Sequence, residues 1–168
     1  MLRENWHLLS AEATVLDYAC GLGGNAIFLA KKNLPVHAWD ISTVAIDKIT
    51  QYAKDNELSI KLTVRDVELN PVEPETFDAI VVSNFLHRPT FNSLLAGITP
   101  GGLLFYQTFT VNKLDNVGPT NPDYLLQTNE LLEQCINFEI LVYREEGKSG
   151  NINLGWRNQA MIVAKKSC

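Results

Sequence analysis

Three aspartates and a glycine-rich turn are the residues of this sequence whose types and spacing could bind a ligand. The run 15–25 reads VLDYACGLGGN, so an apolar segment that carries Asp17 leads directly into three glycines. Glycines let a strand turn sharply into a helix, and they let a ligand approach the main chain beside the positive N-terminus of that helix. Asp40 follows roughly 20 residues after the turn begins, a position suited to the hydroxyls of a ribose, and Asp66 ends the next apolar run.

Each of these features also has a purely structural interpretation. A glycine turn can be a tight connection and nothing more, and an aspartate at the end of a strand often caps the following helix. In a parallel sheet, however, the carboxyl ends of the strands line the ligand crevice. Three acids on the first three strands, beside one glycine turn, therefore predict a ligand site at that edge.

The elements that would position these residues follow from alternating sequence patterns. β-branched runs alternate with apolar stripes at helical spacing, which is typical of parallel strands joined by helices. Strands are expected at 14–19, 35–40, 59–64, 77–83 and 103–109, after the turn Pro100-Gly101-Gly102. Helices are expected at 24–32, after an N-cap at Ser42, from Pro89 onward, and around 128–135.

Two last apolar runs, 138–143 and 159–164, have no helical pattern between them and predict an antiparallel pair. The expected fold class is therefore α/β, a Rossmann-like doubly wound sheet of five parallel strands plus a C-terminal antiparallel hairpin, seven strands in all. We expect one domain over residues 1–168. The segment 111–127 has no clear period, and such a stretch often serves as a lid or binding loop.

Composition narrows the class of protein. The chain of 168 residues is 46% hydrophobic and carries a net charge of −5, without the basic face that nucleic-acid binders usually have. Its three cysteines are widely spaced, and no ligand pattern for a metal is present. No apolar run is long enough for a membrane helix, and the N-terminus does not open a signal peptide. We expect a cytoplasmic protein without nucleic-acid, membrane or metal partners.

The same residues, taken in order, resemble a known family. Asp17-x-Ala19-Cys20-Gly21-x-Gly23 is followed by Ala38-Trp39-Asp40-Ile41-Ser42, by Arg65-Asp66-Val67 and by Pro100-Gly101-Gly102. From about Val15 to Phe109 this order is similar to that of the class I S-adenosylmethionine-dependent methyltransferases. The runs 20–26 and 39–42 look most like the small tellurite-resistance-type methyltransferases. The resemblance implies a methyltransferase with S-adenosylmethionine as cofactor and a small-molecule acceptor, a thiol or a chalcogen oxyanion such as tellurite.

The resemblance also implies which residues hold the cofactor. Around its methionine part they are Asp17, at the amino group directly or through water, Gly21, Gly23, Ser83 and Phe85. Around its nucleoside they are Asp40 at the ribose, Ile41 and Val67 against the adenine, and Asp66 at the adenine amino group. Ala19, Cys20 and Asn25 of the turn complete the expected set.

Two departures from the family pattern bear on the site. Ala19 stands where the pattern often has glycine. Relatives usually have one or two helices before the first strand, whereas here only residues 1–13 precede it. We therefore expect either an open site or a site that something else closes; the oligomeric state stays undetermined.

His87 and Arg88 are the candidate catalytic residues, because they follow the fourth strand at the ligand edge. An imidazole can take a proton or hold an anion, and a guanidinium can fix an oxyanion. Equally, His87 could precede and cap the helix at Pro89, with Arg88 in solvent. Further candidates on the acceptor side are Arg3, Trp6, Arg157 and one of Tyr106 and Gln107, whereas Trp39 and Trp156 are expected in the core.

Two other functions remain open at this point. Gly21-x-Gly23-x-x-Ala26 with Asp40 also fits a loose dinucleotide fingerprint, which would indicate an NAD(P)-dependent oxidoreductase. Asp17 speaks against it, because small or apolar residues usually occupy that place before a dinucleotide turn. The short N-terminal segment would also suit a cofactor-binding protein that is not an enzyme or that needs a partner.

Overall fold

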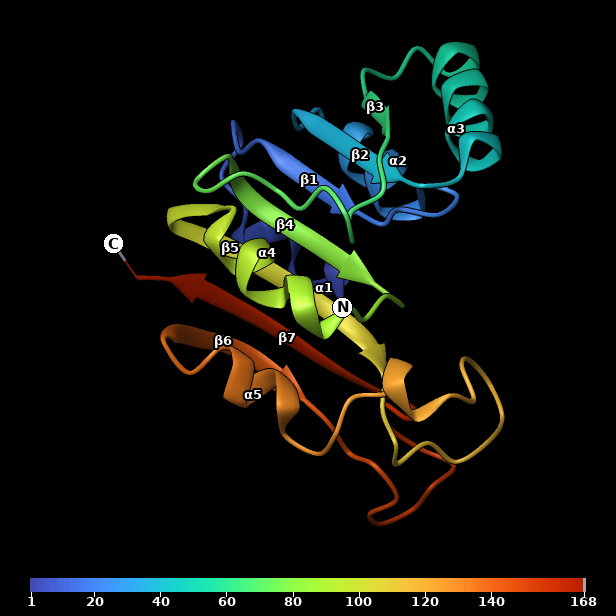
Figure 1. Ribbon diagram of the computed structural model, residues 1–168, viewed down its shortest axis with the longest axis vertical. Coiled ribbons are helices and arrows are strands. Elements are labelled where there is room, and N and C mark those ends of the chain that lie inside the picture. Colours follow the sequence, from blue (N-terminus) through green and yellow to red (C-terminus); the bar gives the residue numbers. More distant parts are fainter. Residues whose placement is uncertain (168) are drawn as a thin grey trace.

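A seven-stranded sheet forms the centre of the molecule in the computed structural model, which describes residues 1–167 (Figure 1). The strand order is β3-β2-β1-β4-β5-β7-β6. The first five strands are parallel, and β7 runs antiparallel to both β5 and β6. The strands are β1 Val15–Tyr18, β2 Val36–Asp40, β3 Lys61–Val64, β4 Phe77–Ser83, β5 Ile98–Phe109, β6 Phe138–Arg144 and β7 Gln159–Lys166. The expected α/β fold is confirmed.

Helices cover both faces of this sheet. The α-helices are α1 Leu2–Asn5, α2 Gly24–Ala30, α3 Thr43–Asp55, α4 Phe91–Ala96 and α5 Glu130–Gln134. Short 3-10 turns lie at Trp6–Leu8, Arg88–Thr90 and Pro122–Tyr124. In Figure 1, α4 and α5 lie in front of the sheet, and α1 and α2 lie behind it. None of the helices in residues 1–167 has the length and apolar character that crossing a membrane requires.

The alternation of side chains along β1 divides the core into two layers. Leu16 and Tyr18 pack on the side of α4 and α5, whereas Val15 packs on the side of α2. Asp17 shares the α2 side and is 1% exposed, so a charged residue type is buried in the central strand of the parallel sheet. Burial of this kind needs hydrogen-bond partners, which the start of α2 supplies.

The N-terminal segment packs against α2 behind the sheet. Leu2 is buried in the same cluster as Leu29 of α2. The guanidinium of Arg3 lies 4.8 Å from the ring centre of Phe28, and Trp6 meets the same ring edge-on. This packing brings the first residues of the chain to the edge of the sheet where β1 ends.

The connection between β3 and β4 contains no helix. Arg65 organises this loop, because its guanidinium stacks 4.1 Å from the ring centre of Trp39 and donates hydrogen bonds to the carbonyls of Asn70 and Pro71. A planar, charged group can cover an aromatic face and satisfy backbone carbonyls at once. Trp39 is thereby 6% exposed, as expected for a core residue.

Strand β5 begins earlier than the sequence predicts. The expected turn Pro100-Gly101-Gly102 lies inside the strand, where the register with β4 shifts between Phe77 and Ala79. Gly101 has φ +75°, and a Cβ at Gly102 would lie 2.7 Å from the carbonyl oxygen of Asp78. The glycines therefore make an irregularity inside the sheet and allow close approach to β4.

The segment 111–127, for which the sequence indicates a lid or binding loop, is fastened to the sheet at several points. Thr110 bridges to Leu126, and the N–H of Leu114 donates to Asn158 Oδ1 at 2.7 Å. Arg88 holds its far end: it donates to the carbonyls of Asp123 and Leu125 and to both carboxylate oxygens of Glu130, at 2.7 and 2.9 Å.

Arg88→Met should destabilise the fold, because Glu130 is only 7% exposed and would remain as a carboxylate without its cation. The pair is only partly buried, because 36% of the Arg88 side chain is exposed, so removing the cation should cost about 1–3 kcal/mol of unfolding free energy. Urea unfolding of the wild type and the variant measures the difference in unfolding free energy. The double variant Arg88→Met, Glu130→Gln should recover part of the loss, and a single variant as stable as the wild type would contradict the role.

Candidate functional site

Two adjoining hollows lie at the carboxyl edge of the parallel strands. The first, here the acidic hollow, has a volume of about 280 Å³ and is lined by Ala19, Asp40, Ile41, Asp66, Val67, Glu68, Asn84 and Phe85. The second, here the amide hollow, has a volume of about 740 Å³. Its lining residues include Arg3, Ala19, Cys20, Gly21, Asn25, Ser83, Asn84, Gln107 and Trp156. Ala19 and Asn84 line both hollows, so one elongated ligand could occupy the two together.

The backbone at this junction adopts an unusual conformation. Ala19, Gly21 and Asn84 all have positive φ, at 53°, 55° and 58°. A Cβ at Gly21 would meet nothing within 4 Å, so the main chain there faces open space. Glycine is the residue that adopts such angles without strain, which explains the family's preference for glycine at the position of Ala19.

Asp40 connects the glycine turn to the end of β2. Its Oδ2 accepts the N–H of Gly21 at 2.7 Å, and its Oδ1 accepts the N–H of Ser42 at 2.9 Å. Ser42 in turn caps α3 by accepting the N–H of Ala45, as the sequence predicts. Each carboxylate oxygen has two lone pairs, so each retains one for a ligand hydroxyl.

The remaining walls of the acidic hollow are held by buried tyrosines. The Tyr18 hydroxyl donates to the carbonyl of Val67 at 3.1 Å, and the Tyr106 hydroxyl donates to the carbonyl of Phe85 at 2.7 Å. Tyr106 therefore belongs to the core, and its strand neighbour Gln107 faces the amide hollow. Asp66 Oδ1 accepts the N–H groups of Glu68 and Leu69, which fixes its carboxylate at the rim.

Asp17 lies beneath the glycine turn and lines neither hollow. Its Oδ2 accepts the N–H of Ala26 at 2.9 Å, and its Oδ1 accepts Asn25 Nδ2 at 3.3 Å. Asn25 Nδ2 also donates to Ser83 Oγ at 3.1 Å. The amide group of Asn25 is thus oriented by Asp17 and Ser83. Burial raises the pKa of Asp17 to about 7, against the opposing effect of the hydrogen bonds from Ala26 and Asn25.

Gly23 lines neither hollow, and its lack of a side chain instead allows close packing. A Cβ at this position would lie 2.7 Å from Ile49 Cδ1 of α3, and its φ is +70°. Its carbonyl accepts the N–H of Ile27 in the first turn of α2. Cys20 does line the amide hollow, and burial raises the pKa of its thiol to about 12, so the thiol is neutral near pH 7.

His87 and Arg88 line neither of these hollows. They line a third hollow of about 390 Å³ together with Glu68, Leu86, Pro89, Asp123 and Tyr124. His87 Nδ1 is 3.0 Å from Thr90 Oγ1, and its Nε2 is 3.7 Å from a Glu68 carboxylate oxygen. Arg88 uses its guanidinium to hold Glu130 and the neighbouring loop. The structure brings ten of the predicted cofactor residues together and places this pair elsewhere.

Asn84 and Trp156 line the hollows, which the sequence did not predict. Asn84 sits between the predicted Ser83 and Phe85, and its tolerance of positive φ was the available signal. Trp156, expected in the core, packs against the core layer on the α2 side, and it also lines the amide hollow from the β6–β7 loop. Nothing in its local sequence indicates this, because the loop has no regular element to fix its direction.

Comparisons with known proteins agree with this geometry. The family model described as "Methyltransferase domain" matches residues 15–102, more than half of the chain. No curated protein sequence matches. Among solved structures, TehB from Haemophilus influenzae superposes with a TM-score of 0.79 at 23% identity, covering 99% of this chain and 61% of its own, so this chain spans less than two thirds of TehB.

Two further structures show the same fold. A SAM-dependent methyltransferase from Methanosarcina mazei has a TM-score of 0.72 and 19% identity, with 96% of each chain covered. One from Aquifex aeolicus has a TM-score of 0.72 and 16% identity, covering 97% of this chain and 88% of its own. The family match favours methyl transfer over the nicotinamide-dependent alternative.

The buried Asp17 carboxyl predicts a pH-dependent stability. Its pKa in the folded chain is above its ordinary value of 3.8, so between about pH 4 and pH 7 the folded state holds a proton that the unfolded state releases. The unfolding free energy should therefore fall across this range, by up to about 1.4 kcal/mol per pH unit. Asp17→Asn cannot titrate and should lose this dependence.

Urea unfolding at pH 4 to 8 tests the effect, with Asp47→Asn on the exposed face of α3 as the matched control. The stability difference between wild type and Asp17→Asn should shrink or reverse as pH rises. A difference that is constant with pH would show that Asp17 keeps an ordinary pKa.

Proposed function

We propose, from the premise that this chain belongs to the methyltransferase-domain family, that it transfers a methyl group to a small thiol or to a chalcogen oxyanion such as tellurite. S-adenosylmethionine is the cofactor of the enzyme. The observation that carries the proposal is the pair of hollows that meet at Ala19 and Asn84. One is suited to a nucleoside, and the other is wide enough for both the methionine part and an acceptor.

The acidic hollow fits the nucleoside of the cofactor. Asp40 retains one lone pair on each oxygen for the two ribose hydroxyls. An adenine ring could pack on the apolar side chains of Val67 and of Ile41, which is 65% exposed. Asp66 can accept a hydrogen bond from the amino group of the adenine. Three carboxylates in this hollow also favour a ligand that carries net positive charge.

The glycine turn fits the methionine part. Gly21 and Gly24 leave open space before the main chain, which a Cβ would narrow. Asn25 uses its amide N–H groups for Asp17 and Ser83, so its carbonyl oxygen is the part of the side chain that can accept from an ammonium group. Asp17 acts here as a positioning residue for Asn25, whereas the resemblance implied that it holds the amino group directly or through water.

When bound, the cofactor would supply an electrophilic methyl group on a sulfonium sulfur, for transfer to an acceptor lone pair while the sulfur keeps the electrons of the bond it loses. The residues around the amide hollow would hold the acceptor in line and exclude water, which supplies much of the rate in such displacements. Glu4 is the only carboxylate lining this hollow among residues 1–167, and it is exposed.

The residues that line the amide hollow favour an acceptor that arrives already deprotonated. A thiolate or an oxyanion needs no strong base, whereas a hydroxyl or amine would. The neutral Cys20 thiol supplies no base, and His87 lies in the third hollow. Formation of S-adenosylhomocysteine in the presence of thiols, selenite, tellurite and small carboxylates tests the acceptor class directly. Turnover with none of the first three would contradict the proposal.

Asp40→Asn should weaken S-adenosylhomocysteine binding. The amide replaces one accepting oxygen by a donor, so a ribose hydroxyl or the Gly21 N–H loses its partner. Hydrogen bonds to a charged group are each worth about 1.5–3 kcal/mol, so the Kd should rise at least tenfold. Calorimetry measures the affinity, and Asp47→Asn serves as the control. An unchanged Kd would show that Asp40 only joins the two turns.

A further inference from the structure

Three side-chain amides form a hydrogen-bonded relay beside the amide hollow. Gln107 Nε2 donates to Gln159 Oε1 at 2.9 Å, and Gln159 Nε2 donates to Asn84 Oδ1 at 2.6 Å. Gln107 belongs to β5 and Gln159 to β7, whereas Asn84 directly follows β4. Because each amide passes its N–H to the next carbonyl in the same direction, the relay ends in a spare carbonyl at Gln107 and a spare N–H group at Asn84.

The two ends of this relay lie side by side at the amide hollow. The backbone N–H of Asn84 donates to the backbone carbonyl of Gln107 at 2.9 Å, and both residues line the hollow, whereas Gln159 does not. Gln107 Oε1 has no partner within residues 1–167. It is accessible, because the Trp156 indole nitrogen is the one covered and unpartnered side-chain polar atom among the buried and half-buried residues of that range. Asn84 is exposed, and its Nδ2 has no acceptor within the same range.

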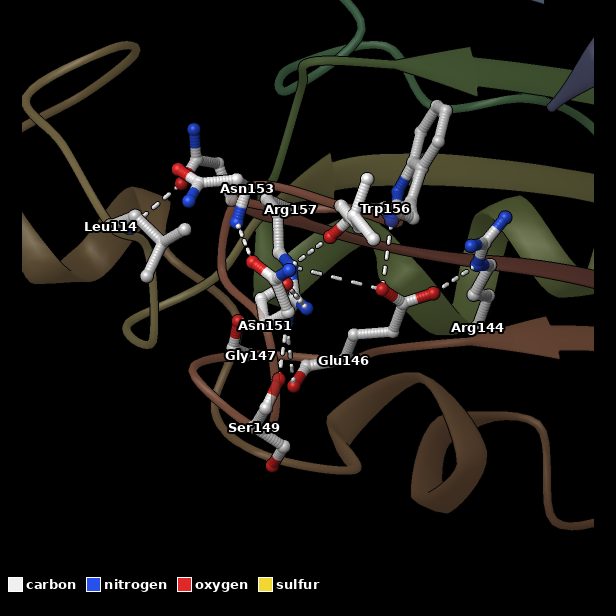
Figure 2. Close-up of polar contacts among 11 residues, drawn as sticks. Leu114, Arg144, Glu146, Gly147, Ser149, Asn151, Asn153, Trp156 and Arg157 are labelled. Atoms are coloured by element: carbon white, nitrogen blue, oxygen red, sulfur yellow. Dashed lines mark hydrogen bonds and ion pairs between the residues drawn. The ribbon is translucent and has the colours of Figure 1, made fainter.

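The loop between β6 and β7 fixes the middle of the relay (Figure 2). Gln159 begins β7, two residues after Arg157. The guanidinium of Arg157 donates at 2.6 to 3.0 Å to four carbonyls of this loop, those of Gly147, Ser149, Asn151 and Leu154. Figure 2 shows these contacts gathered around Arg157. The start of β7 is thus held in place, which fixes the backbone from which Gln159 extends its amide.

The spare donor and acceptor lie where a methyl acceptor would have to enter. Ala19 and Asn84 line both hollows, so they mark the place where the nucleoside and methionine parts of the cofactor would join, at its sulfur. An acceptor atom must reach this junction. The atoms next to it would then lie against Asn84 and against Gln107, its neighbour in the sheet.

A carbonyl beside an N–H group complements a ligand group that has both a donor and an acceptor. A carboxamide is such a group, because its N–H can donate to Gln107 Oε1 while its oxygen accepts from Asn84 Nδ2. A fully deprotonated oxyanion offers no donor and would bring negative charge to the Gln107 carbonyl. Arg3 and Glu4, the two charged side chains that line the hollow within residues 1–167, have opposite signs and do not favour an anion.

We propose that Gln107 and Asn84 form a carboxamide-recognition site for the methyl acceptor, with Gln159 as the residue that positions both. The acceptor is then a small thiol that carries a carboxamide a few bonds from its sulfur. This rests on the proposed function and decides there between a thiol and an oxyanion. Specificity arises because a ligand without a carboxamide would leave the amide carbonyl of Gln107 and the N–H of Asn84 unpaired.

Three thiols of the same shape test the recognition directly. They are 3-mercaptopropionamide, 3-mercaptopropionate, which only accepts, and 3-methylbutane-1-thiol, which does neither. The protein is saturated with S-adenosylhomocysteine, which has no methyl group to transfer, so calorimetry measures binding alone. The Kd of the amide should be about tenfold or more below that of either other thiol. An equal Kd for all three, tightest binding of the carboxylate, or binding of none overturns the proposal.

Asn84→Asp should reverse the polarity of the site. Aspartate keeps an oxygen for Gln159, replaces the spare N–H by an accepting oxygen, and tolerates the φ of +58° at this position. Two acceptors then face the ligand, so the variant should bind cysteamine, whose ammonium donates, about tenfold more tightly than the wild type does and should lose its preference for the amide. Asn92→Asp makes the same change on the exposed side of α4, outside the hollow, and should keep the wild-type order.

Gln159→Glu tests the relay itself, because this residue does not line the hollow. Glutamate still accepts from Gln107 but cannot donate to Asn84, so the Asn84 amide should turn its N–H toward Glu and its oxygen toward the hollow. The variant should therefore show the same shift from the amide to cysteamine. A merely structural role would lower the melting temperature without changing which thiol binds best, and an unchanged order of thiols in both Asn84→Asp and Gln159→Glu overturns the proposal.

Failure of this recognition is distinguishable from failure of the proposed function. S-adenosylhomocysteine binding that persists while the preference for the amide is absent overturns the carboxamide site and leaves the methyltransferase function intact. Loss of S-adenosylhomocysteine binding by the wild type would instead contradict the function itself, and the acceptor site with it.

Discussion

The carboxylate of Asp40 fixes the relative position of the two turns on which the site depends. It binds the N–H of Gly21 on one side and the N–H of Ser42 on the other, so the glycine turn after β1 and the start of α3 after β2 are held by one side chain. The open backbone before Gly21 and the floor of the acidic hollow both follow from this bridge. A single short acid at the end of β2 therefore has a structural task and, in the function proposed above, a ligand-binding task as well.

The rest of the acidic hollow is fixed from within the sheet. Tyr18 and Tyr106 extend from β1 and β5 through the core and hold the carbonyls of Val67 and Phe85. The loops that line the hollow are consequently tied to buried strands by hydrogen bonds in a low-dielectric interior, where such bonds are strong. A site prepared in this way loses little conformational entropy when a ligand binds.

Local patterns predicted most of the sheet and most of the residues that line the acidic hollow. Strand alternation, the Ser42 cap and the spacing from Gly21 to Asp40 and Asp66 depend on near neighbours in the chain. The failures involve partners far apart in sequence. Arg88 pairs with Glu130, 42 residues away, and Trp156 reaches the hollow through a loop that Arg157 and Glu146 organise. No periodicity encodes such contacts, because they arise only when the sheet is assembled.

The order of strands at one side of the sheet constrains how the chain can assemble during synthesis. β7 lies between β5 and β6, although it follows both in the chain. Until β7 has left the ribosome, β5 presents an unpaired edge and β6 has no neighbour to join. Unpaired strand edges in partly synthesised chains are prone to aggregation. The apolar run of β7, Ala160 to Ala164, must therefore be captured quickly once it emerges, and this half of the molecule stays vulnerable until its last strand is made.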